Sequence, residues 1–366
     1  MREAGYFPAD YTEARRRFRE AATAAGAVLG KYDHPAPGPA GEALTTDTAW
    51  LGPREASRVL VTFSSTHGVE GFAGSGIQVG WFESGLAAAT LPAGTALLAV
   101  HAINPHGFAW LRRVTHENVD LNRNFVDFAA PLPRNPGYDE LADAICPRDW
   151  SEASRAAAQA VLEAYALRHG AAALQKALSG GQYTHPDGVF FGGAAPTWSR
   201  RTVERIVGEH LRDRRSVAVI DFHTGLGPYG YGEAIVMHRD GSAALARARR
   251  WYGEERVTSP LLGSSTSADL SGDMLSALER MLAVGAGIEF TGMALEFGTL
   301  PLQQVADALR ADNWLHLHGD PASPEGRRIK AQIRDALYCD RDDWKSMLFE
   351  QGADAQRRAL DGLAAS

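Results

Sequence analysis

Residues 57–70 read SRVLVTFSSTHGVE, an apolar run with β-branched residues that leads directly into a polar segment. The run Ser57–Ser64 has the length and composition of a buried strand, which is typical of a parallel sheet. The segment after it holds His67 and Glu70, three residues apart. This spacing lets an imidazole and a carboxylate reach one metal ion, but such a pair also occurs by chance and needs support from the rest of the chain.

The pattern of apolar residues predicts a sheet of several strands separated by helices. Other strands are predicted at Thr95–Ile103, Ser216–Phe222, Ala234–His238, Ile288–Thr291 and Met293–Phe297. Helices are predicted at Tyr11–Leu29, Gly71–Phe82, Pro147–Leu178, Thr202–Leu211, Ala243–Tyr252 and over most of Leu302–Ala364. Strands that alternate with helices predict an α/β layered fold with a mostly parallel sheet and functional loops at the carboxyl ends of its strands.

We expect the chain to form one domain over residues 1–366, because no linker, repeat or low-complexity tract interrupts the pattern. Residues 1–56 are expected to be a lead-in, with a helix followed by a loop or short hairpin at 31–53. Residues 131–215 are expected to form a large insertion near the site, and residues 302–366 a helical C-terminal segment.

Composition excludes several classes of protein. The 366 residues include 37 Lys and Arg and 44 Asp and Glu, so the net charge of −7 argues against a general nucleic-acid-binding surface. Two cysteines, Cys146 and Cys339, are too few for a disulfide framework or a four-thiolate zinc site. No secretory signal and no membrane-spanning apolar run is visible, so we expect a cytoplasmic protein without a membrane partner.

Further candidate residues lie in or directly after other buried strands. His223 follows the strand 216–222, so it should meet His67 and Glu70 at one edge of the sheet. A His, a Glu and a His leave a zinc ion one open position, which a catalytic site requires. Glu296 and Glu289 are carboxylates in apolar strands, and either could be a catalytic base or an ion-pair partner. The pattern alone favours Glu296 only slightly.

The segment 112–125, RRVTHENVDLNRNF, carries three arginines after the strand 95–103. An exposed basic loop is the simpler interpretation. Arginine beside asparagine nevertheless offers a fork of donors that suits a substrate carboxylate, and an arginine near a metal can stabilise an oxyanion.

The combined motifs resemble the zinc carboxypeptidase superfamily, which contains carboxypeptidase A-like exopeptidases and the aspartoacylase and succinylglutamate desuccinylase deacylases. The motifs that match, in order, are His67-x-x-Glu70, Asp120-Leu-Asn-Arg-Asn-Phe125, His223 and Glu296-Phe-Gly-Thr299. The chain looks most similar to a bacterial branch catalogued as a domain of unknown function, which shows patterns like those at 191–198 (FGGAAPTW) and 223–230 (HTGLGPYG). The resemblance implies a three-layer α/β/α fold with a mixed, mostly parallel central sheet.

The resemblance also implies a role for each matching residue. One zinc ion per chain would be bound by three ligands: His67, Glu70 and His223. Glu296, rather than Glu289, would be the general base and acid. The remaining matches are Arg113 for oxyanion stabilisation, Asn122 and Arg123 for binding a substrate carboxylate, and Asp120 for orienting the first zinc histidine.

Two features depart from the characterised branches. Carboxypeptidase A-like enzymes place a mobile tyrosine over the substrate some twenty residues before the catalytic glutamate, whereas residues 257–273 contain no tyrosine. The aspartoacylase branch usually carries a C-terminal β domain, whereas residues 302–366 are predicted to be helical.

We therefore expect a zinc-dependent hydrolase that cleaves an amide or peptide bond next to a free carboxylate, as a metallocarboxypeptidase does. An N-acyl amino acid deacylase is the alternative, and an inactive metal- or peptide-binding protein is weaker because a binder needs no base. No Gly-x-Ser-x-Gly motif supports a serine hydrolase. Four aromatic residues of the Gly-rich stretch 180–198 are expected to line the pocket or to pack in the core: Tyr183, Phe190, Phe191 and Trp198.

Overall fold

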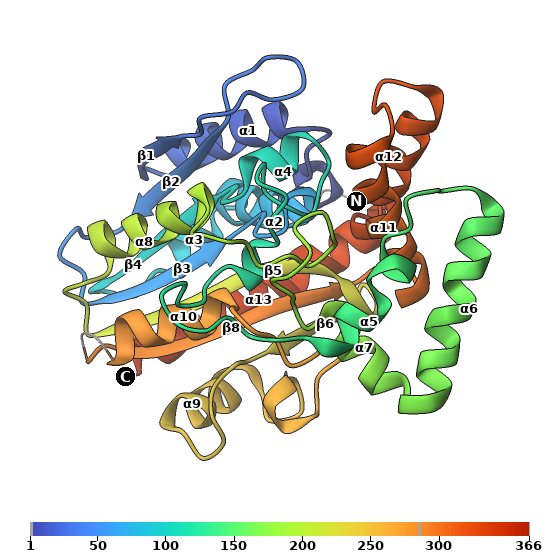
Figure 1. Cartoon of the computed structure of the whole chain (residues 1–366). Helices are drawn as coiled ribbons and strands as arrows, with labels where there is room; N and C mark the ends of the chain where they lie inside the picture. The colour runs from blue at the N-terminus through green and yellow to red at the C-terminus, as the bar shows by residue number, and fades with distance from the viewer. Residues whose placement is uncertain (1–2, 285–286, 366) are drawn as a thin grey trace.

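The computed structural model describes residues 3–284 and 287–365, which surround one mixed sheet (Figure 1). In this part of the chain the sheet has eight strands, in the order β1-β2-β4-β3-β5-β8-β6-β7. The strands are β1 (Val28–Asp33), β2 (Thr45–Leu51), β3 (Arg58–Phe63), β4 (Thr95–His101), β5 (Ser216–Tyr229), β6 (Gly232–Ile235), β7 (Val257–Thr258) and β8 (Glu289–Gly298). The central strands β4, β3, β5 and β8 are parallel neighbours, and β6 also runs parallel to β7, whereas the other three pairings are antiparallel.

Helices cover both faces of the sheet. They are α1 (Tyr11–Ala24), α2 (Gly71–Glu83), α3 (Leu86–Ala89), α4 (Pro105–Ala109), α5 (Pro136–Ile145), α6 (Glu152–His169), α7 (Ala171–Ser179), α8 (Trp198–His210), α9 (Ala243–Tyr252), α10 (Met274–Glu279), α11 (Leu302–His318), α12 (Pro324–Leu337) and α13 (Asp342–Ala364). This arrangement confirms the α/β/α fold with a mixed central sheet.

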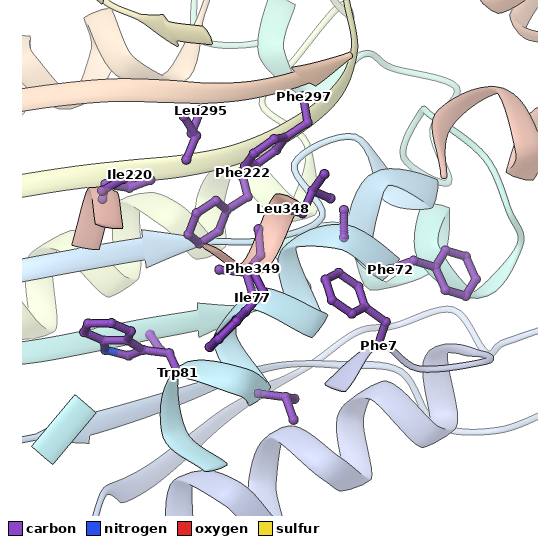
Figure 2. Close-up of a cluster of buried hydrophobic side chains, with 14 of the residues drawn as sticks. Phe7, Phe72, Ile77, Trp81, Ile220, Phe222, Leu295, Phe297, Leu348 and Phe349 are labelled. Atoms are coloured by element: carbon purple, nitrogen blue, oxygen red, sulfur yellow. The ribbon is translucent and has the colours of Figure 1, made fainter. Parts of the chain in front are cut away.

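Alternation of side chains along the strands explains the layers. In β5, Ile220 and Phe222 belong to one hydrophobic cluster, to which α1, α2, α9, α11, α12 and α13 contribute. Val217 and Val219 belong to a second cluster, to which α8 and α10 contribute. Figure 2 shows part of the first cluster, including Phe222 from the sheet and Ile77 from α2. Strands that are apolar on both faces need such cover on both sides.

Three strand predictions are wrong in their extent. The strand predicted at Ala234–His238 is β6, which covers Gly232–Ile235. The strand predicted to stop at Phe222 continues to Tyr229, and its pairing with β8 shifts register between Thr224 and Tyr229, a stretch that includes Gly225 at φ 128°. The two strands predicted at 288–291 and 293–297 are one strand, β8, because Gly292 keeps its place in the ladder with β5.

Two helix predictions also need correction. The helix predicted over 147–178 is two helices, α6 and α7, because Gly170 between them has φ 91°. The helix predicted to reach residue 29 ends at Ala24, and residues 28–29 begin β1. The helix α5 was not predicted. No helix within the described residues combines the length and the apolar character needed to cross a membrane.

The segment of α5, α6 and α7 has a small hydrophobic cluster of its own, which includes Tyr138, Ile145 and Leu162. In Figure 1 these helices lie to one side of the sheet, next to α11. Arg310 of α11 joins the two parts, because it donates hydrogen bonds to the Ala144 and Ile145 carbonyls at the end of α5. This segment and α11 therefore stand beside the sheet edge that carries the candidate site.

Candidate metal centre

The first two candidate ligands lie in a tight turn after β3. His67 precedes a single turn of 3₁₀-helix, η2 (Gly68–Glu70), which leads directly into α2. Residues three apart lie on the same side of a 3₁₀-helix, so the His67 and Glu70 side chains face the same way. Gly68 is required here, because a β-carbon would overlap the Arg112 carbonyl and the backbone of Gly107. This close approach brings the loop that carries Arg113 against the site.

The third candidate, His223, completes a compact group of donors at the carboxyl end of the parallel strands. His67 Nδ1 lies 3.0 Å from Glu70 Oε1 and 3.1 Å from His223 Nδ1. His223 Nδ1 is also 3.2 Å from Glu70 Oε2. All three side chains are buried, and their ligand atoms lie within 4.8 Å of one another. Two imidazole nitrogens and a carboxylate oxygen are a donor set that suits Zn²⁺, and this is the one such group found among the described residues.

The other ring nitrogen of His223 is held by an aspartate, and that of His67 is held by an aspartate together with an arginine. His223 Nε2 lies 2.6 Å from Asp221 Oδ2, and His67 Nε2 lies 3.2 Å from Asp120 Oδ1. Thr66 Oγ1 donates to Asp221 Oδ1 at 2.8 Å and so fixes that carboxylate. At His67, Arg113 Nη2 lies 2.9 Å from the Nε2 atom that Asp120 also contacts. The Asp221 carboxylate on Nε2 of His223 favours a proton there and leaves Nδ1 of this histidine to bind a metal. The sequence analysis assigned this function to Asp120 and missed Asp221, although alternate residues of a strand share a face.

The charges at the centre are strongly coupled. Burial opposes ionisation of Glu70, but His67 and His223 hold its pKa well below the usual range. Burial also opposes protonation of His223, but Asp221 and Glu70 raise its pKa well above the usual value. A metal ion must displace the proton from this imidazole, so metal affinity should rise with pH.

The base candidate Glu296 lies directly across from His223, because the two residues pair in the register of β8 with β5. Its Oε1 accepts a hydrogen bond of 3.0 Å from the Leu226 amide. Burial, together with the negative charge of Glu70, raises the pKa of Glu296 to about 8. A carboxyl group with a pKa near neutrality can both accept and return a proton. Glu289, seven residues earlier, is instead 3.6 Å from Arg247 and its side chain is 39% exposed.

Arg113 links the candidate metal ligands to Asp120. Its Nη1 donates to Glu70 Oε1 at 3.1 Å and its Nε to Asp120 Oδ2 at 3.0 Å. Burial opposes ionisation of Asp120, but Arg113 and Arg123 hold its pKa well below the usual range. The guanidinium therefore lies at the edge of the centre with a charged anchor on each side.

Asn122 and Arg123 lie next to α7 and α10. Asn122 Oδ1 accepts a hydrogen bond from the Met274 amide at 2.8 Å, so its amide group is left to act as a donor. Arg123 donates through Nε and Nη2 to the Ser179 carbonyl and through Nη1 to the Asn122 carbonyl. Within the described residues these bonds use three of its five N–H donors, which leaves two for a ligand. Arg123 therefore also caps the end of α7, a task the sequence did not indicate.

A cavity of about 460 Å³ brings most of the predicted site residues to one surface. Those that line it are His67, Arg113, Asn122, Arg123, His223 and Glu296. Glu70 and Asp120 contact His67 but are not part of this surface.

The four aromatic residues expected at the pocket do not lie there together. Phe190 lines the cavity, with its ring 5.3 Å from the guanidinium carbon of Arg113. The prediction that they line the pocket is wrong for the other three, which are not among the lining residues. The Tyr183 hydroxyl, for example, donates to the Arg123 carbonyl, and Trp198 packs against His34.

Comparison with known structures shows that the chain shares its fold with a bovine protein solved in complex with a carboxypeptidase inhibitor. Over 98% of both chains, the protein is similar to bovine thrombin-activatable fibrinolysis inhibitor, solved in complex with tick carboxypeptidase inhibitor, with a TM-score of 0.50 and 10% identity. Carboxypeptidase A from Helicoverpa armigera is 13% identical, with a TM-score of 0.47, over 89% of this chain and 73% of that one. A protein assigned to the succinylglutamate desuccinylase/aspartoacylase family of Shewanella amazonensis is 17% identical, with a TM-score of 0.36, over 78% and 72% of the chains.

The chain belongs to the DUF2817 family, described as a protein of unknown function, whose model matches residues 7–351. No curated protein matches the sequence. Family membership therefore agrees with the branch that the sequence motifs indicated, and the activity has to be argued from the site.

Proposed function

We propose that the protein is a zinc-dependent hydrolase that cleaves an amide or peptide bond next to a free carboxylate. One observation carries the proposal: both histidines of the His-Glu-His donor group, a buried carboxyl group and an asparagine–arginine pair line the same cavity, and Glu70 contacts His67 behind this surface. Each of these groups alone could serve only to stabilise the fold, whereas their combination supplies a metal site, a base and a carboxylate receptor.

The proposed roles follow from the contacts of each side chain. His67, Glu70 and His223 would hold one zinc ion, with Asp120 and Asp221 behind the histidines. A bound zinc ion would supply Lewis-acid activation of a water molecule and of the scissile carbonyl.

Glu296 would move the proton that hydrolysis requires. It would take this proton from the attacking water and give it to the leaving amine, so that the amide and water become a carboxylic acid and an amine. The Arg113 guanidinium would stabilise the oxyanion in the transition state. Asn122 and Arg123 would hold the substrate carboxylate and so fix the position of the scissile bond.

The test is turnover, measured by mass spectrometry, of the zinc-loaded protein on one mixed panel. The panel contains peptides with a free C-terminus, their amidated counterparts and N-acyl amino acids, and Glu296→Gln serves as the blank. Release of the last residue from free but not amidated peptides would support a carboxypeptidase. Cleavage of N-acyl amino acids alone would support the deacylase. No turnover on any arm would contradict the proposed hydrolysis.

The expected partner is thus a small peptide or N-acyl amino acid with a free carboxylate. The cytoplasmic location stays a prediction from the sequence.

A further inference from the structure

Part of the cavity lining is apolar and has no role in the proposed reaction. We call it the acyl pocket and define it by Ile145, Leu226, Leu302, Val305, Leu309 and Leu337. Val305, Leu309 and Leu337 are buried, whereas Leu302 is 54% exposed. The pocket therefore combines a buried apolar wall with an apolar residue that reaches solvent.

The acyl pocket begins beside the proposed base. Leu226 donates its amide hydrogen to Glu296, and the side chains of Val305 and Leu337 lie with the Glu296 carboxylate around the open side of Gly225. Asn122 and Arg123, by contrast, are held by the start of α10 and the end of α7. The lining of one cavity thus includes the two carboxylate-binding candidates, the two histidines of the metal centre and residues of α11.

Arg310 of α11 is part of the cavity lining, and its charge is neutralised by other groups of the protein. Arg310 donates to the Ala144 carbonyl at 2.7 Å, to the Ile145 carbonyl at 2.8 Å and to Asp307 Oδ1 at 3.0 Å. Carbonyls at the end of a helix carry partial negative charge and bind cations well. Arg310 therefore fixes α5 against α11. The part of the cavity wall next to it is formed by the apolar side chains of Val305 and Leu309.

Resting on the proposed function, we propose that the acyl side of the substrate's scissile bond carries an apolar group, which binds in the acyl pocket. A substrate whose carboxylate is held by Asn122 and Arg123 and whose scissile carbonyl lies at the metal centre would extend its acyl part toward α11. Burial against Val305, Leu309 and Leu337 would then favour apolar groups in proportion to their buried area. The same chemistry is offered by an aliphatic N-acyl chain and by an apolar penultimate residue of a peptide.

Binding to a form that does not turn over tests this directly. We would titrate the zinc-loaded Glu296→Gln protein with N-acetyl-, N-butyryl- and N-hexanoyl-leucine by calorimetry. A parallel arm compares the peptides Gly-Gly-Leu and Gly-Leu-Leu. If the acyl chain enters the pocket, Kd should fall roughly threefold for each buried methylene, or about eightyfold from acetyl to hexanoyl. A gain along either arm supports the proposal, and the arm that shows it identifies the source of the apolar group.

Matched variants locate the effect on α11. Adding Leu309→Asn should reduce the gain from acetyl to hexanoyl to less than about tenfold, because a polar group replaces part of the wall. Leu317→Asn makes the same change on α11 at a side chain that is 37% exposed and should leave the gain intact. Val305→Ala, a milder change, should lower the gain about threefold if Leu309→Asn does not fold.

The outcomes separate this inference from the proposed function. Equal affinities along both arms, absence of binding, or a full gain in Leu309→Asn would overturn the acyl pocket. A gain that depends on Leu309 in a protein that hydrolyses none of these compounds would uphold the pocket and overturn the proposed hydrolysis.

Discussion

The central parallel strands carry charged residues at both their amino and their carboxyl ends, and these residues differ in how deeply they are buried. At the amino edge Ser216 of β5 lies opposite Arg58 of β3 and Glu289 of β8. Glu289 keeps a side chain that is 39% exposed. At the carboxyl edge His223 lies opposite Glu296, which is only 8% exposed. Both glutamates belong to β8, so their difference in exposure depends on what covers each edge of the sheet.

The pKa of a carboxyl group at the end of a strand depends on whether loops or solvent cover that end. At the carboxyl edge η2, the loop that carries Arg113 and the bend after His223 surround Glu296, so ionisation is costly and the pKa rises. At the amino edge Glu289 lies 3.6 Å from Arg247 and keeps 39% of its side chain exposed. A carboxylate in an apolar strand is therefore a candidate base only where the fold closes over it.

The largest expected effect contrasts the two glutamates as catalysts. Glu296→Gln should lower kcat by about a thousandfold, because proton transfer is lost, whereas Glu289→Gln should change kcat less than about twofold. Turnover of the best substrate from the panel measures both.

Zinc content provides the control for this pair, since Glu296→Gln should still bind one zinc ion per chain. Near-normal turnover in Glu296→Gln, or an equal loss in Glu289→Gln, would show that the carboxyl edge does not hold the base.

The stability of the metal-free protein should separate the same two residues by pH. In the unfolded chain Glu296 ionises near pH 4.5, whereas in the folded protein burial and Glu70 raise its pKa to about 8. The unfolded state loses this proton first, so the folded protein loses stability as the pH rises from about 4.5 to 8. At about pH 8, Glu296→Gln should therefore exceed the wild type in unfolding free energy by on the order of 3 kcal/mol.

Urea denaturation of both forms measures this difference, which should vanish near about pH 4. The matched change Glu289→Gln should alter the unfolding free energy by less than about 1 kcal/mol at either pH. A difference between wild type and Glu296→Gln that does not vary with pH would contradict the raised pKa.

A smaller effect is expected from the aspartate behind His223. Asp221→Asn removes the charge that orients the imidazole, so zinc affinity should fall about ten- to a hundredfold. Competition with a chromogenic chelator measures it. Asp213→Asn, an exposed aspartate before β5 at the amino edge, is the matched control and should leave the affinity unchanged. Equal affinities for Asp221→Asn and wild type would remove Asp221 from the site.

The smallest effect concerns the hydroxyl that fixes this aspartate. Thr66→Val removes the 2.8 Å hydrogen bond to Asp221 Oδ1, and one such bond is worth about 1 kcal/mol. We therefore expect a loss of about fivefold in zinc affinity by the same competition. A loss as large as that in Asp221→Asn would mean that Thr66 does more than hold the carboxylate.

Site residues whose positions follow from the local pattern of apolar residues could be predicted from the sequence. His67 and His223 follow or continue apolar runs, and parallel strands bring such positions together at one edge. The pattern favoured Glu296 over Glu289 only slightly, because exposure is decided by segments far away in the chain, and the choice between them rested on the family resemblance. It also could not assign Arg123 to the end of α7, since that contact depends on the packing of the segment 131–215.

An X-ray diffraction experiment at the zinc absorption edge, on crystals grown with zinc, tests the central claim most directly. We predict one anomalous peak per chain within bonding distance of His67 Nδ1, His223 Nδ1 and the Glu70 carboxylate, and none in crystals of His223→Ala. A peak at other residues, or no peak between these three side chains at saturating zinc, would contradict the metal centre on which the proposed function rests.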